Sequence, residues 1–431
     1  MNSGHGVTLN GIRGFPSTLG TSFFKNMPSS LFTRYSELRH HTLQLAAPLS
    51  AEDQCVQSMP DTSPTKWHLA HTSWFFESLV LKPFSQNYQV FDEAFAFLFN
   101  SYYEALGPRH PRPERGLLTR PGLNEVMAFR QHVDAAMQHL LSHPAGLNPQ
   151  ALALIELGLN HEQQHQELLL TDALHLLSCH PLLPSYDSSM SNSKAHVGEM
   201  HWLSYPEGLH SFGRAMDEPD FAFDNETPKH QRFVQGFQIA SRLVNCGEYL
   251  AFIQDGGYDN ADLWLSEGRA HVLNNAWQSP LYWLAPHDPR APSDQWQVFG
   301  LNGVQALDPQ APVCNLSFYE AAAFAQWAGA RLPTEFEWEL ASAHPHMHDL
   351  HGQVWQWTRS AYEPYPGFVP ASGAVREYNG KFMVGQQVLR GSSFATPAHH
   401  SRRTYRNFFP ASARWQFSGL RLAKDLQSPA S

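Results

Sequence analysis

Apolar residues recur every three or four positions along four segments in the first part of the chain. This spacing places apolar side chains on one face of an α-helix, so each segment is predicted to be a helix that buries that face. Four helices of this length predict a helical bundle over residues 27–185. The predicted helices are Ser30–Leu45, Thr65–Leu81, Leu123–Ser142 and Asn148–Ser178.

The pattern changes after a stretch rich in Pro, Ser and Asn, Pro181–Lys194, which is predicted to be a linker. Over residues 195–425 the apolar runs are short, and Gly, Pro and Trp are frequent. This character predicts an irregular α+β domain, and therefore a two-domain α+β protein. Its predicted elements are the short strands Phe237–Ile239 and Val388–Arg390 and the short helices Ser317–Ala328 and Glu335–Ala341.

Composition excludes several classes of partner. The 431 residues carry a net charge of −10 and no basic block, which argues against nucleic acid or an anionic membrane surface as partner. No apolar run is long enough to span a bilayer. Residues 1–26 are rich in Gly, Ser and Asn and lack the charged-then-apolar pattern of a secretion signal, so we expect a flexible leader.

The chain has four cysteines, Cys55, Cys179, Cys246 and Cys314, and no two of them are close in sequence. The absence of any C-x-x-C pair argues against a zinc site built from cysteines. This usage suits a reducing compartment, so we expect a cytoplasmic protein.

The segment His161–Glu167 carries two histidines four positions apart within the last predicted helix of the bundle. Side chains at i and i+4 lie on one helix face, where two imidazoles can bind one metal ion. The segment also matches the H-E-x-x-H pattern of zinc peptidases, which take a third ligand downstream. The one histidine at a suitable distance, His175, lies about 15 Å further along the same helix, too far to share the ion.

A third ligand is available upstream, in the second predicted helix. His68 and His71 stand there among aromatic residues, and either one closes a three-histidine site if this helix faces the last one. Three histidine ligands on one face of a metal ion leave the opposite coordination positions open for substrate and dioxygen, as in non-haem iron sites. The alternative interpretation is that these histidines belong to the aromatic core of the bundle.

Several separated motifs resemble the EgtB-type sulfoxide synthases of ergothioneine biosynthesis. Two belong to the predicted bundle, Ser63–Glu77 and His161–Glu167. The motifs of the second domain are Phe223–His230, Gly329–Glu339, Gly352–Thr358, Thr404–Phe409 and Arg414–Arg421. The resemblance implies a DinB-like helical bundle followed by a domain of the formylglycine-generating-enzyme type, a relative of the C-type lectin fold.

The resemblance also implies a reaction and a metal site. These enzymes use iron(II) and dioxygen to join a thiol to C2 of the imidazole of hercynine, and they oxidise the sulfur to a sulfoxide. By the motif, His71, His161 and His165 are the expected iron ligands, and His68 is not. Gln164 is expected to position the substrate imidazole, and Glu162 to anchor a histidine or a neighbouring helix rather than act as a base.

The tyrosine pair Tyr102 and Tyr103 is similar to the branch of the family that uses free cysteine. The reaction needs a proton donor, and a tyrosine hydroxyl near the metal can serve, so both are candidates and one of them is expected to point inward. Arg112 and Arg115 stand in a proline-stiffened loop suited to a bidentate grip on the cysteine carboxylate. A solvated basic loop is the alternative.

Hercynine carries a quaternary ammonium group, which favours aromatic faces. Trp415 and Phe417 are candidates for the wall that meets it, and Arg414 is a candidate for holding a substrate carboxylate. The alternative for all three residues is packing within a Trp-rich core.

Other activities remain open at this stage. Formylglycine-generating enzymes work through a cysteine pair, and residues 401–405 in the matching region contain none, so that activity is not expected. The same chemistry with γ-glutamylcysteine or a selenosugar as donor, or with histidine as acceptor to give a 5-histidylcysteine sulfoxide, is a close alternative. A zinc peptidase and a lectin-like binding module are the alternatives from other classes.

Overall fold

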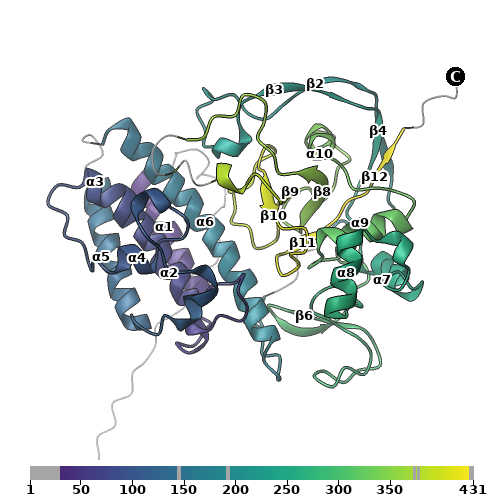
Figure 1. The fold of residues 1–431 in the computed structure, drawn as a ribbon, viewed down its shortest axis with the longest axis horizontal. Coiled ribbons are helices and arrows are strands. Elements are labelled where there is room, and N and C mark those ends of the chain that lie inside the picture. Colours follow the sequence, from purple (N-terminus) through teal and green to yellow (C-terminus); the bar gives the residue numbers. More distant parts are fainter. Residues whose placement is uncertain (1–29, 143–146, 191–194, 372–374, 376–378, 427–431) are drawn as a thin grey trace, which may run out of the picture.

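The computed structural model describes the chain except for residues 1–29, 143–146, 191–194, 372–374, 376–378 and 427–431. The predicted leader over residues 1–26 and the end of the predicted linker therefore lie outside the described residues. Two bodies are visible in Figure 1, a helical bundle and a mixed domain of sheets and short helices, which pack together along α6.

The N-terminal body is the predicted bundle. Its helices are α1 (Leu31–Ala46), α2 (Thr65–Phe76), α3 (Lys82–Phe84), α4 (Phe95–Leu98), α5 (Leu123–Leu141) and α6 (Pro149–Ser178). The four long helices confirm the four predicted segments, except that α2 passes into a π-helical turn at Glu77–Leu81. Short 3₁₀ turns complete this body at Asp53–Cys55, Glu104–Leu106 and Arg112–Leu117.

Helix α2 is the centre of the bundle, since all twelve of its residues are buried. Its polar side chains must therefore find partners inside the protein rather than water. Helix α6 crosses α2 closely at Gly158, where an added Cβ would lie 2.6 Å from the Phe76 ring and 2.9 Å from the Phe75 ring. The side chain of Asn148 caps α6 by accepting a hydrogen bond from the Ala151 amide, and Pro149 takes the first helical position.

The second domain is built from small sheets. Its strands form the orders β10-β9-β8-β11, β1-β4-β12, β5-β6-β7 and β2-β3. Its helices are α7 (Cys246–Gln254), α8 (Ser266–Asn275), α9 (Phe318–Trp327) and α10 (Glu335–Ala341). Its strands are β1 (Trp202–Tyr205), β2 (Gly208–Phe212), β3 (His230–Val234), β4 (Phe237–Ala240), β5 (Trp283–Leu284), β6 (Gln297–Gly300), β7 (Gly303–Ala306), β8 (Trp355–Ala361), β9 (Gln387–Gly391), β10 (Asn407–Phe409), β11 (Ser418–Gly419) and β12 (Ala423–Asp425).

A partly buried carboxylate on α6 joins the two domains. Glu167 accepts hydrogen bonds from Trp355 Nε1 at 2.8 Å, from Ser393 Oγ at 2.5 Å and from Thr396 Oγ1 at 2.7 Å. Burial raises the pKa of this carboxyl group, and the three donors oppose that rise. The contact fixes the face of α6 that carries the histidines against the sheet β10-β9-β8-β11.

Candidate metal centre and active-site cavity

Three histidines from two helices of the bundle converge inside the protein. Helix α2 supplies His71, and α6 supplies His161 and His165. One nitrogen from each ring lies within 4.8 Å of the other two, and Nε2 of His71 is 3.2 Å from Nε2 of His161. In the described part of the chain this is the one group of three or more His, Cys, Asp or Glu side chains close enough to share a metal ion.

Hydrogen bonds to neighbouring groups set the tautomer of two of these rings. His71 Nδ1 lies 2.6 Å from the carbonyl oxygen of Phe99, which can only accept, so the ring keeps its lone pair on Nε2. His68 Nε2 lies 3.0 Å from Asp172 Oδ2 and donates to it, so His68 Nδ1 accepts from His165 Nδ1 at 2.8 Å. His165 is thereby left with its lone pair on Nε2, and His68 serves as a support rather than a member of the group.

The protonation state of the three rings suits metal binding. Burial lowers the pKa of His71, His161 and His165, that of His161 to about 3. Neutral imidazole is the form that binds a metal, so no proton has to be removed at neutral pH. Three neutral nitrogen donors fit a divalent first-row transition metal with open positions.

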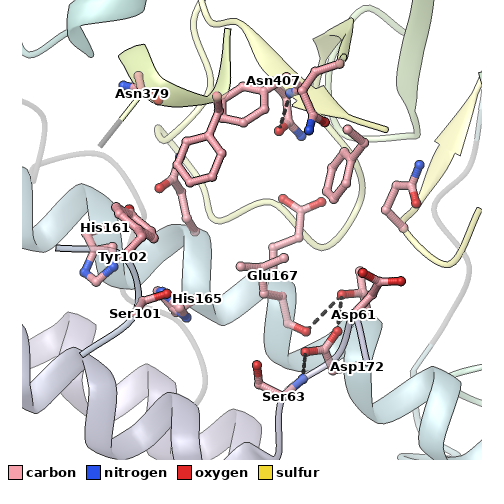
Figure 2. A pocket seen from close by; sticks show the side chains of 18 of the residues that line it. Asp61, Ser63, Ser101, Tyr102, His161, His165, Glu167, Asp172, Asn379 and Asn407 are labelled. Carbon is pink, nitrogen blue, oxygen red and sulfur yellow. Dashed lines mark hydrogen bonds between the residues drawn. The ribbon is translucent and has the colours of Figure 1, made fainter. Parts of the chain in front are cut away.

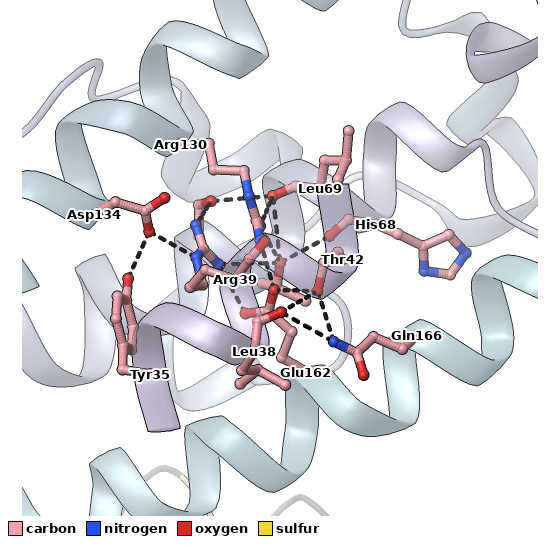
Figure 3. A network of polar contacts seen from close by, with 12 residues as sticks. Tyr35, Leu38, Arg39, Thr42, His68, Leu69, Arg130, Asp134, Glu162 and Gln166 are labelled. Atoms are coloured by element: carbon pink, nitrogen blue, oxygen red, sulfur yellow. Dashed lines mark hydrogen bonds and ion pairs between the residues drawn. The ribbon is translucent and has the colours of Figure 1, made fainter. Parts of the chain in front are cut away.

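Glu162, the second letter of the H-E-x-x-H pattern, points away from this centre into a buried ion network (Figure 3). It pairs with Arg39 at 2.8 Å and with Arg130 at 2.7 Å, and it accepts a hydrogen bond from Thr42 at 2.7 Å. These partners lie on α1 and α5, so Glu162 anchors both helices to α6. The carboxylate is therefore unavailable as a peptidase base, and the expectation that it anchors neighbouring helices is confirmed.

Removing the Glu162 charge is expected to destabilise the bundle. The Glu162→Gln variant leaves two buried guanidinium groups facing one another, and we expect the free energy of unfolding to fall by about 3 kcal/mol in urea titrations. The two arginines lower the pKa of Glu162 to about 2, so this contribution is complete above the ordinary carboxyl pKa and is lost as pH falls through about 2. Glu156→Gln is the matched control, because its partner Arg34 is solvent-exposed and its loss costs under about 1 kcal/mol. Equal effects of the two substitutions would contradict the network's role.

Two of the three histidines, His161 and His165, border a cavity of about 300 Å³ between the two domains. Figure 2 shows His161, His165 and Tyr102 on one side and Asp61, Asp172 and Ser63 on the other, with Glu167 between them. The second domain supplies the opposite wall, and its lining residues include His400, Tyr405, Asn407, Phe408 and Trp415. The cavity therefore requires both domains.

The two candidate tyrosines lie in different surroundings. Tyr102 lines the cavity, and it shares a side-chain hydrogen bond with Tyr103. Tyr103 is fully buried within the bundle, with its ring centroid 5.5 Å from that of Trp74 and 6.4 Å from that of Phe75. Burial raises the pKa of Tyr102, which keeps its hydroxyl protonated at neutral pH. Tyr102 is thus the better placed of the two to donate a proton into the cavity.

Arg112 and Arg115 both reach the cavity wall. Arg115 is buried, donates to Ser63 Oγ at 2.8 Å and to Ser101 Oγ at 3.0 Å, and stacks 3.4 Å above the Trp67 ring. Arg112 donates to the carbonyl oxygen of Asp61. Among the described residues neither guanidinium has a carboxylate within ion-pair distance, and burial lowers the pKa of Arg115. A buried cation that is not in direct contact with a carboxylate favours an anionic ligand.

The structure places the three candidates of the C-terminal motif, Arg414, Trp415 and Phe417, in different surroundings. Trp415 lines the cavity. Arg414 turns back to Glu320, with which it pairs at 2.7 Å, and its guanidinium lies 4.2 Å over the Trp277 ring. Phe417 packs on Phe394, with ring centroids 4.5 Å apart, on the side of a different cavity. The structure therefore does not bring Arg414 or Phe417 to the substrate cavity.

Gln164 lines the cavity beside His165, and its Nε2 donates to the Tyr405 hydroxyl at 2.6 Å. Sequence reasoning assigned no role to Tyr405, Asn407 or Phe408, although all three belong to a motif that carried the family resemblance. His400 was missed altogether, because nothing in its sequence surroundings distinguishes it from the other histidines of the chain.

Two family profiles match the two bodies. Residues 188–347 and 344–426 match the sulfatase-modifying factor enzyme 1-like domain, and residues 34–169 match the DinB superfamily. The hercynine oxygenase of Mycolicibacterium smegmatis is 31% identical over 63% of this chain and 71% of its own length. The chain belongs to the hercynine oxygenase family.

Two further members of the family match almost the whole chain. The hercynine oxygenase of Mycobacterium tuberculosis is 29% identical over 93% of this chain and 99% of its own length. That of Mycolicibacterium thermoresistibile is also 29% identical, over 90% of this chain and 93% of its own length. These matches confirm the family resemblance and the two-domain fold inferred from the motifs, and membership of the family makes the chain an oxygenase. Among the described residues, no helix has the length and apolar character needed to cross a membrane.

Proposed function

We propose that this protein is an iron(II)- and dioxygen-dependent sulfoxide synthase of ergothioneine biosynthesis. In the proposed reaction, the sulfur of cysteine joins C2 of the hercynine imidazole, and the product is hercynylcysteine sulfoxide. The observation that carries the proposal is the group of three neutral histidines, His71, His161 and His165, of which His161 and His165 line a cavity formed by both domains. Family membership supports it, since the relatives are named for hercynine.

The proposed reaction balances without any other reductant. The S–H bond of cysteine and the C2–H bond of the imidazole break, a C–S bond forms, and one oxygen atom is added to sulfur. Together these changes remove four electrons from the two substrates. One molecule of dioxygen accepts all four electrons, because its second oxygen atom leaves as water with the two hydrogens.

The three histidines would hold the iron, and the chemistry that bound iron(II) supplies is the activation of dioxygen. The chain's own residues bind and orient the substrates around it. Arg115 and Arg112 offer two cations to the carboxylate of cysteine at the cavity wall. Phe408 and Trp415 offer aromatic faces to the quaternary ammonium of hercynine. The protonated hydroxyl of Tyr102 is the candidate proton donor.

Oxygen consumption and product analysis test this function directly. Iron-loaded protein is expected to take up oxygen only when cysteine and hercynine are both present, with one hercynylcysteine sulfoxide formed for each dioxygen. Mass spectrometry of mixtures in which γ-glutamylcysteine or a selenosugar competes with cysteine measures the donor preference, and histidine in place of hercynine tests the acceptor. Oxygen uptake without any C–S product from any of these pairs would refute the proposal. A preference for another sulfur or selenium donor would support the proposed reaction type but would show that cysteine is not the substrate.

A further inference from the structure

A buried carboxylate lies two hydrogen bonds away from one of the metal-binding histidines. Asp172 Oδ2 lies 3.0 Å from Nε2 of His68, and Nδ1 of His68 lies 2.8 Å from Nδ1 of His165. Asp172 and His68 are buried, at 6% and 2% exposure, which shields these bonds from competing water. The three side chains therefore form a continuous line that leaves α6, passes through α2 and returns to α6 at the metal centre.

The carboxylate of Asp172 sets the direction of both hydrogen bonds. Its Oδ2 also accepts the backbone N–H of Ser63 at 2.8 Å (Figure 2), so this oxygen is an acceptor and His68 Nε2 carries a proton. A neutral imidazole has one N–H, so Nδ1 of His68 has a lone pair and accepts from Nδ1 of His165. The opposite tautomer of His68 would set a lone pair against the carboxylate. Asp172 thereby excludes the arrangement in which His165 Nε2 carries the proton and cannot bind a metal.

Two of the metal-binding histidines differ in the charge of the group behind them. Nδ1 of His71 lies 2.6 Å from the carbonyl oxygen of Phe99, which is a neutral acceptor. Behind His165 lies His68, and behind His68 lies a carboxylate. An acceptor that is polarised by a negative charge makes a stronger hydrogen bond, and such a bond makes the donor ring a more basic ligand. We therefore expect His165 to donate more electron density to a metal than His71 does.

We infer that Asp172 and His68 are positioning residues that orient His165 and increase its electron donation to the bound metal. The inference rests on the proposed function, because it takes iron as the metal in the histidine group. Stronger donation stabilises iron(III) more than iron(II), since the ion of higher charge gains more from it. Asp172 thus lowers the midpoint potential of the iron, which suits an oxygenase because iron(II) then releases an electron more readily.

The Asp172→Asn variant removes the charge and retains the hydrogen bonds. The amide oxygen of asparagine can replace Oδ2 and accept from both Ser63 and His68. Its NH₂ group then faces the Thr171 hydroxyl, which lies 3.4 Å from Oδ1 of Asp172 and can accept. We expect the iron(II) affinity to fall about tenfold and the iron(III) affinity about 100-fold, so that the midpoint potential rises by about 59 mV. Competition with a chelator and titration with redox dyes measure these quantities under nitrogen. Substrates are left out, because Asp172 also lines the cavity.

A double-mutant cycle shows whether Asp172 acts through His68. In the His68→Leu background the link is absent, so the further change Asp172→Asn is expected to alter either iron affinity by less than about threefold. Glu77→Gln is the matched control, because Glu77 is also a buried carboxylate of the bundle but accepts from Tyr88 and Phe91 rather than from a histidine. It is expected to leave both affinities unchanged. Urea titration of each variant checks that the fold is retained.

An unchanged midpoint potential in Asp172→Asn would overturn the inference, and with a lower free energy of unfolding it would indicate a purely structural role. A shift that is equal with and without His68, or equal in Glu77→Gln, would show that Asp172 acts only as a nearby charge and would overturn it as well. If Asp172→Asn failed to fold, His68→Leu alone would carry the test, since it is also expected to raise the potential. Failure of the proposed function has a different signature, since the unmodified protein would then form no C–S product from any thiol and acceptor pair.

Discussion

Replacing His71 by Ala is expected to abolish iron binding and substrate-dependent oxygen uptake together. His71 is the one member of the histidine group that α2 supplies, so its loss leaves His161 and His165 as two neighbouring ligands on α6. Two imidazoles hold a divalent ion far more weakly than three, and we expect the iron affinity to fall by more than about 100-fold. Metal analysis after gel filtration, together with an oxygen electrode, measures both effects.

His175→Ala is the matched control for this substitution. His175 lies on the same helix as two of the predicted ligands, and its Nδ1 bonds to Ser58 Oγ at 2.7 Å. It takes no part in the histidine group, so iron content and oxygen uptake are expected to stay at the level of the unmodified protein. A His71→Ala protein that retained one iron per chain would show that the metal is held elsewhere.

Replacing Tyr102 by Phe is expected to redirect the reaction rather than to stop it. Without the hydroxyl the cavity loses its candidate proton donor, and oxidation of the thiol to a sulfinic acid then competes with C–S bond formation. General acid catalysis contributes about 100-fold or more, so the ratio of sulfoxide to sulfinic acid is expected to fall by at least tenfold. Quantitative mass spectrometry of both products gives this ratio.

The neighbouring Tyr103→Phe variant decides which phenol acts. Tyr103 packs against Trp74 and Phe75 inside the bundle and does not line the cavity, so its substitution is expected to leave the product ratio nearly unchanged. A shift with Tyr103→Phe alone would assign the proton donor to Tyr103. A ratio unaffected by either substitution would show that the proton comes from another group.

The bundle was predictable because its information is local. Apolar residues at intervals of three and four indicate helices wherever they occur. The N-terminal cap of α6 is likewise formed by two residues adjacent in sequence, Asn148 and Pro149. His161 and His165 could be recognised as a pair for the same reason, because they lie only one helical turn apart. The choice of His71 over His68 came from the family motif, and the structure shows both side chains to be buried near His165.

The second domain was less predictable because neighbouring side chains in irregular segments point in unrelated directions. Arg414, Trp415 and Phe417 are close in sequence, yet they reach Glu320, the cavity and Phe394 respectively. No periodic pattern in the sequence predicts these three different side-chain positions, so all three residues were candidates. Only the path of the backbone between β10 and β11 separates them.

The sequence by itself determined the two-domain organisation, the family and the pair of histidines on α6, because periodic patterns and ordered motifs are properties of the chain. The tertiary structure alone decided which groups meet across the domain boundary. Glu167 meets Trp355, and Gln164 meets Tyr405 more than two hundred residues away. Such contacts depend on how α6 packs against the sheet β10-β9-β8-β11, and a hydrogen bond of that range leaves no pattern in a single sequence.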